Sequence, residues 1–267
     1  MSRPITTPDV PVIVAASILS IYDSPVLPIM KAGTAATLEK EGVRLFQAIG
    51  SQPIIRVLTE APPSEYYKVL WNSCTTTSIW IGSLNFGDTL DTLLRTFELT
   101  GFGDARMSGP SNSHTLVTLN EVVALYGEGK LKCSTLVKDV ASRAITVEQD
   151  IPLIDAMKTM LEMRVRRLFL KGKKGEFISD RAILAFLFSP KGLKIARDSP
   201  NFWTNLSVSE IETMKAHAVS SDAMVEDVGS IVERGRDVFI LPDGLSLLSR
   251  WDLVMKPWKA GQLHLSR

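Results

Sequence analysis

The sequence contains few of the residues that build metal centres and disulfide frameworks. Its 267 residues include two cysteines and three histidines. Cys74 and Cys133 stand far apart, without the close spacing of zinc ligands, so we expect two buried thiols in a reducing compartment. No P-loop, dinucleotide-binding glycine motif, HExxH motif, or Ser–His–Asp or Cys–His pattern is recognisable. We therefore predict a protein that is not an enzyme and has no metal site.

Net charge and long apolar runs are also scarce. The formal net charge of +1 argues against a surface that neutralises many phosphates of a nucleic acid. The apolar stretch Val10–Tyr22 contains Pro11 and is far shorter than the roughly 20 residues that cross a bilayer. We expect it to be a buried strand or a short helix in a cytoplasmic protein, with neither nucleic acid nor membrane as a partner.

The stretch Val137–Leu184 predicts the order strand, helix, strand, strand, helix. Ile145–Val147 is the first strand, and a helix is expected from Asp150. After it come two short apolar strands at Leu168–Leu170 and Phe177–Ile178, and a second helix from Ser179. The first helix has apolar residues three and four positions apart, at Leu153, Ala156, Met157, Met160 and Leu161.

The same order returns about 70 residues later, which is typical of a repeated supersecondary unit. The segment Arg234–Ile240 corresponds to Arg164–Leu170, and Leu247–Leu253 corresponds to Phe177–Ile183. A further copy upstream has a helix from Asp88, with a hairpin strand and second helix over 114–122. The later of the two helices in each copy begins beside a Ser or Thr at 118, 179 and 249.

This constellation resembles the cystathionine-β-synthase (CBS) domain family. The resemblance implies an α/β (α+β) fold of tandem repeats, each a small sheet with two helices, paired by pseudo-twofold symmetry. Four copies in one chain are similar to the γ subunit of AMP-activated protein kinase and its archaeal relatives. In this family, adenosine-containing ligands bind in the cleft between paired copies.

The copies are expected to pair as neighbours, with a boundary near residue 130. The first domain, 1–130, holds a degenerate first copy and a second copy at about 80–128. The second domain, 131–267, holds copies at about 135–190 and 205–258. In the first copy we expect strands at Gly42–Ile49 and Pro53–Leu58, a turn at Gly50–Ser51 and a helix at Pro62–Trp71.

Ser249 and Asp252 are the leading candidates for ligand binding. A carboxylate can accept two hydrogen bonds from a ribose diol, and the resemblance places such an acid at the start of this helix. The alternative is a capping box, since Ser-x-x-Asp also satisfies a helix end. Thr118 and Glu121 have the same spacing in the second copy, whereas Ala182 replaces the acid after Ser179.

Further candidates would contact the base and the phosphates. By resemblance, His217, Ala218 and Val219 form the strand that would meet an adenine. Arg166 and Arg250 have guanidinium groups suited to phosphate oxygens. The alternatives are an ordinary histidine and solvated helix-end charges.

The resemblance implies a regulatory protein that senses an adenine nucleotide (AMP, ADP or ATP) and transmits occupancy to a protein partner or a second copy of itself. S-adenosylmethionine is a further candidate ligand, and no catalytic cofactor is expected. The alternative is a ligand-free CBS scaffold whose exposed helices and Trp258 tail bind other proteins.

Overall fold

This computed structural model describes residues 6–21, 26–30, 37–62, 65–109, 114–199, 205–232 and 237–266. The chain divides into two compact units. Unit 1 comprises residues 1–83 and 145–214, and unit 2 comprises 84–144 and 215–267. Residue 130 lies inside unit 2, so neither unit coincides with the expected domains 1–130 and 131–267. The pairing of neighbouring copies stays a prediction.

The third copy, in unit 1, has the predicted order of elements. It consists of β9 (Thr146–Val147), α7 (Leu153–Glu162), β10 (Arg167–Leu170), β11 (Glu176–Ser179) and α8 (Asp180–Leu187). Strand β9 is parallel to β10, and β11 is antiparallel to it. Helix α7 begins at Leu153 rather than at Asp150, because Pro152 takes an extended conformation and disfavours a helical residue before it.

The sequence suggested a degenerate first copy without a clear first helix, whereas the described residues of this copy include two helices and three strands. It contains α1 (Val12–Ile21), β1 (Val26–Pro28), β2 (Thr37–Lys40), β3 (Val43–Gly50) and α2 (Ser51–Glu60). Strands β1 and β2 are both antiparallel to β3. Thr6 forms a parallel bridge to Ile29, in the place where β9 pairs with β10 in the third copy.

Helix α2 replaces the strand expected at Pro53–Leu58. Ile54, Ile55 and Leu58 give this segment one fully buried face. Pro53 lies in the first turn, where backbone N–H groups have no acceptor within the helix and a proline is therefore tolerated. Helix α1 likewise decides the open question about Val10–Tyr22 in favour of a helix.

Other elements of unit 1 surround these two copies. They are α3 (Tyr66–Trp71), η2 (Cys74–Thr77), β4 (Ile79–Asn85, antiparallel to β3 over 79–83), α9 (Pro190–Asp198) and η4 (Val208–Glu210). Helix α3 confirms the helical part of the expected Pro62–Trp71 segment from Tyr66 onward. Helix α2 packs against α7 and α8, so one hydrophobic core joins the first and third copies.

The fourth copy, in unit 2, repeats the third. It consists of β13 (His217–Ala218), α11 (Val225–Ser230), β14 (Val238–Ile240), β15 (Ser246–Ser249) and α12 (Arg250–Lys259). Strand β13 is parallel to β14, and β15 is antiparallel to it, as in the third copy. Arg234 and Arg236 lie outside the described residues.

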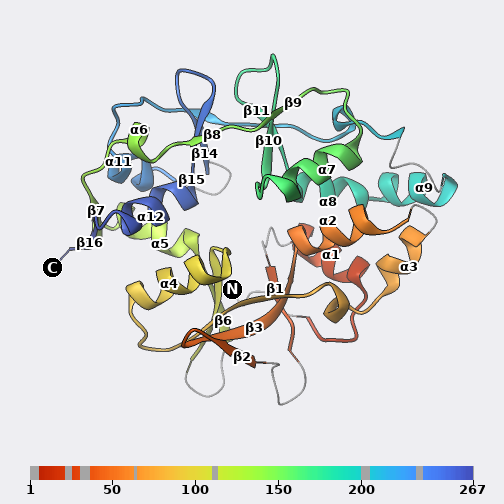
Figure 1. Cartoon of the computed structure of the whole chain (residues 1–267), viewed down its shortest axis with the longest axis horizontal. Helices are drawn as coiled ribbons and strands as arrows, with labels where there is room; N and C mark the ends of the chain where they lie inside the picture. Colours follow the sequence, from red (N-terminus) through yellow and green to blue (C-terminus); the bar gives the residue numbers. More distant parts are fainter. Residues whose placement is uncertain are drawn as a thin grey trace. The chain divides into compact units, whose positions relative to one another are not determined.

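The second copy shares the core of unit 2 with the fourth. It contains α4 (Leu90–Thr100), β5 (Asp104–Ser108), β6 (His114–Thr118) and α5 (Leu119–Gly127), with β5 antiparallel to β6. Helix α5 packs against α11 and α12 (Figure 1). The Tyr126 hydroxyl donates to the Leu253 carbonyl oxygen at 2.8 Å across this contact.

A linking segment is built into the same unit. It contains β7 (Leu131–Cys133), α6 (Val137–Val140) and β8 (Ser142–Arg143). Strand β8 precedes the third copy in sequence but pairs with β15 of the fourth. Strand β7 pairs with β16 (Leu263–Leu265). The expected tail after residue 255 is therefore the end of a helix and a strand.

Trp258 belongs to the fold of unit 2. Its Nε1–H donates to Asp91 Oδ1 at 3.1 Å. The indole N–H therefore has a partner within this chain, although the scaffold alternative had the Trp258 tail binding other proteins. Among the described residues, no helix is long and apolar enough to cross a membrane.

Candidate functional site

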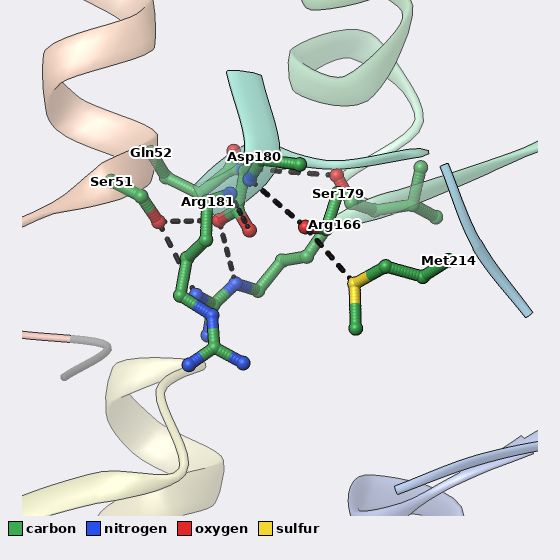
Figure 2. Close-up of polar contacts among 9 residues, drawn as sticks. Ser51, Gln52, Arg166, Ser179, Asp180, Arg181 and Met214 are labelled. Atoms are coloured by element: carbon green, nitrogen blue, oxygen red, sulfur yellow. Dashed lines mark hydrogen bonds and ion pairs between the residues drawn. The ribbon is translucent and has the colours of Figure 1, made fainter. Parts of the chain in front are cut away.

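A partly buried ion pair lies where the first and third copies meet in unit 1 (Figure 2). Asp180, the first residue of α8, is 1% exposed. Its Oδ2 accepts a hydrogen bond from Arg166 Nε at 2.8 Å and another from the Ser51 hydroxyl. Arg166 Nη2 also donates to Ser51 Oγ at 3.2 Å. Because Ser51 is the first residue of α2, the cluster joins the starts of two helices from different copies.

The acid in this cluster is held in its charged form. Burial by itself would raise the pKa of Asp180, but the Arg166 guanidinium and the Ser51 hydroxyl outweigh burial and hold the pKa below its ordinary value. Arg181 adds a further favourable charge. Its backbone N–H donates to Asp180 Oδ1 at 2.9 Å.

Two guanidinium groups influence Asp180. One carboxylate faces the guanidinium groups of Arg166 and Arg181, and in Figure 2 both side chains run toward the same side of it. The Arg166 side chain is 39% exposed, whereas Asp180 is covered. A helix N-terminus flanked by exposed guanidinium nitrogen suits an anion such as phosphate.

In the fourth copy, the predicted acid Asp252 is buried, and donors within the protein occupy its acceptor sites. Asp252 Oδ2 accepts from the Ser249 N–H at 2.9 Å, as part of a capping box, and also from the Ser249 hydroxyl at 2.7 Å. Its Oδ1 accepts from the Ser142 hydroxyl at 2.6 Å and lies 3.0 Å from Lys256 Nζ. A carboxylate offers about four lone-pair sites, and these donors use all of them.

Arg250 is engaged in a second ion pair. Its Nη1 donates to Asp237 Oδ2 at 3.0 Å, and both side chains are largely covered. Asp237 directly precedes β14, as Arg166 directly precedes β10, and Arg250 opens α12 as Asp180 opens α8. The two copies thus contain the same brace between strand and helix with the charges exchanged.

In the second copy, Glu121 Oε2 accepts from both the backbone N–H and the hydroxyl of Thr118, at 2.7 Å each. This is a capping box like that of the fourth copy. The two acids differ in burial, because Glu121 is exposed and Asp252 is not. Of these two cap acids, Glu121 is therefore the one that solvent reaches.

The expected base-binding strand, His217–Val219, lies at the edge of the fourth copy's sheet. The His217 ring is 6.1 Å from that of Phe239, centroid to centroid, and Ala218 is exposed. Phe239 pairs with His217 on one side and with Leu248 on the other. The histidine is therefore about 10 Å from β15, two strand spacings, so a single small ligand would have to span β14.

Comparison with known proteins shows a likeness of structure and none of sequence. No protein-family model matches the chain, and no curated protein matches it. One similar solved structure is that of a Methanocaldococcus jannaschii protein proposed as an archaeal homologue of γ-AMPK, with a TM-score of 0.80 and 15% identity. The match covers 97% of this chain and 96% of that one. The chain has the fold of tandem CBS domains.

A second structural match is to an uncharacterised conserved protein from Pyrococcus horikoshii. Its TM-score is 0.50 at 15% identity, over 95% of each chain. These likenesses confirm the expected fold, including the similarity to γ-AMPK relatives.

Sequence reasoning missed six side chains of the three polar clusters in this CBS fold: Ser51, Asp180, Arg181, Asp237, Ser142 and Lys256. Ser142 and Asp252 are 110 residues apart, so no local spacing indicates their contact. The signal that could have found Ser142 is its place directly before the first strand of a repeat. Among the described residues, no group of His, Cys, Asp and Glu could hold a metal ion.

Proposed function

We propose that this protein is a regulatory, non-catalytic CBS protein that binds an adenosine phosphate and transmits its occupancy to a protein partner. The observation that carries the proposal is the arginine-rich start of α8, where Arg166 and Arg181 flank one buried carboxylate. Asp180 fixes the Arg166 guanidinium in place, so that little side-chain freedom remains to be lost when an anion binds. The likeness to a proposed γ-AMPK homologue supports the same class of ligand.

The two guanidinium groups near the start of α8 favour AMP, ADP or ATP over S-adenosylmethionine. Phosphate oxygens gain charge-assisted hydrogen bonds from guanidinium groups, whereas a sulfonium cation would be repelled by them. The ligand acts by linkage, since it shifts the protein only as far as its affinities for two conformations differ. The cytoplasmic location expected from the sequence is part of this proposal.

A thermal-denaturation screen with AMP, ADP, ATP and S-adenosylmethionine tests it. A ligand at 100 times its dissociation constant stabilises a protein by about 2.7 kcal/mol. We expect stabilisation by at least one phosphate ligand, and a weaker effect on Arg181→Gln. The matched control is Arg197→Gln, which removes an equal charge from an exposed pair with Asp198 on α9. Equal effects in both variants would refute the phosphate assignment.

The second candidate function is a ligand-free scaffold, and the saturated Asp252 favours it. An acid that already accepts from Ser249, Ser142 and Lys256 serves the fold and needs no ligand. No stabilisation by any of the four compounds at millimolar concentration would decide for the scaffold.

A further inference from the structure

Residues 140–143, called the lead-in segment below, precede the third copy in sequence. They contact the N-terminal cap of α12 in the fourth copy. Lys256 Nζ donates to the carbonyl oxygens of Val140 and Ala141, at 2.6 and 3.1 Å, and to Ser142 Oγ at 2.8 Å. The Ser142 hydroxyl in turn donates to Asp252 Oδ1. The Ser142–Lys256–Asp252 network, called the clasp below, therefore ties the end of α6 and strand β8 to the start of α12.

The third copy has an apolar counterpart of this network. Met214 begins β12 (Met214–Lys215), which precedes the first strand of the fourth copy as β8 precedes that of the third. The Ser179 hydroxyl of the third copy's cap contacts Met214 Sδ at 4.0 Å (Figure 2). The third copy has Ala182 where the fourth has Asp252. In the third copy the two facing positions are apolar, Met214 and Ala182. In the fourth copy the two facing positions are polar, Ser142 and Asp252.

We infer that the clasp closes the fourth copy, so that a ligand's ribose can use Asp252 only after the 140–143 segment has released it. This inference rests on the proposed function and adds a regulated ligand site in the fourth copy, distinct from the arginine-rich start of α8 in the third. The Ser142 hydroxyl takes the place on Oδ1 that a ribose hydroxyl would need. Ligand binding in this copy is then coupled to detachment of β8 from β15.

The coupling has a measurable consequence for affinity. Where only a fraction of molecules has the clasp open, the apparent dissociation constant is the intrinsic one divided by that fraction. Removing the Ser142 hydroxyl frees one acceptor site that a ribose hydroxyl can fill. A hydrogen bond to a charged group corresponds to about a factor of ten or more in an equilibrium constant.

The test compares Ser142→Ala with the parent by calorimetric titration with AMP. Lys256→Met is the second variant, which keeps the length of the aliphatic chain. Ser230→Ala is the control, because that exposed hydroxyl bonds only within its own helical turn among the interactions described. Hydrogen exchange at 142–144 without ligand reports on the clasp independently, since the Ala144 N–H donates to the Leu245 carbonyl oxygen.

We expect both clasp variants to bind AMP about tenfold more tightly than the parent and to exchange faster at 142–144. Binding by Ser142→Ala where the parent shows none would also support the inference. Equal affinity of parent and variants would overturn it and leave the proposed function standing. Unchanged exchange at 142–144, or no AMP binding by any variant, would overturn it as well. Whether Arg181→Gln weakens the binding of any of the four compounds then decides the proposed function separately.

Discussion

Replacing Arg166 by methionine tests the brace between the first and third copies. The substitution keeps the aliphatic stem and removes the guanidinium that donates to Asp180 and Ser51. Asp180 is buried and would retain only the Ser51 hydroxyl and the Arg181 N–H as described donors. Removing one partner of a fully buried pair typically costs about 3–5 kcal/mol, and the 39% exposure of the Arg166 side chain reduces this cost.

The reverse substitution is expected to be milder. Asp180→Asn leaves a guanidinium on a side chain that is 39% exposed, so water can solvate the charge. The asparagine carbonyl oxygen can still accept from Ser51. We expect a loss of about 1–3 kcal/mol in the free energy of unfolding, less than for Arg166→Met.

The pH dependence gives the sharper test. Folding lowers the pKa of Asp180 in the parent, so the stability it contributes is complete above its unfolded value of about 3.9 and is lost as pH falls through the folded pKa. Without Arg166, burial is the largest remaining influence and raises that pKa. The variant is therefore penalised above about pH 4, and its difference from the parent should shrink on acidification.

Urea denaturation at pH 7 and at about pH 4.5 measures this difference. Arg197→Met is the control, since its pair with Asp198 is exposed and such pairs contribute about 0–1 kcal/mol. The reasoning fails if Arg166→Met and Arg197→Met destabilise equally. It also fails if the deficit of Arg166→Met is the same at both pH values.

Three further predictions concern unit 2. Gly229→Ala should lower stability by about 1–3 kcal/mol, because its Cβ would lie 2.3 Å from the buried Tyr126 ring. Gly127→Ala, whose Cβ would meet nothing nearer than 3.5 Å, should change stability little in the same urea titration. Asp252→Ala should cost about 1–3 kcal/mol by removing the acceptor of Ser249 and Ser142, measured by the shift of the urea midpoint. Thr118→Val should cost about 1 kcal/mol, the value of a helix cap, in thermal denaturation, and an unchanged melting temperature would contradict the capping role.

The third and fourth copies could be predicted because each confirms the other. Their shared spacing fixes the strand order and the serine caps at 179 and 249 without any knowledge of packing. The first copy lacks that support. Gly50 and Pro53 indicate a turn and a broken strand, and only burial against α7 and α8 shows that Ser51–Glu60 is a helix.

The candidate site was harder to predict than the fold, because its contacts join distant segments. The spacing of Ser249 and Asp252 correctly indicated an acid at a helix start, and its capping-box alternative is present. The other donors to Asp252 come from β8 and from the next turn of α12. Local sequence could show that an acid was present but not how many of its acceptor sites were already used.

The exchanged charges of the third and fourth copies show what the repeat preserves. Arg166 pairs with Asp180, and Asp237 pairs with Arg250, at equivalent places before a strand and at a helix start. The aspartate is the better placed of the two at a helix N-terminus, where negative charge is stabilised and an arginine is not. Preserving the pair despite that disadvantage indicates that the contact between strand and helix matters more than the identity of either residue. An acid or an arginine at a family's ligand position is therefore insufficient evidence of a binding site, because the cap, the brace and the lead-in segment compete with a ligand for the same atoms.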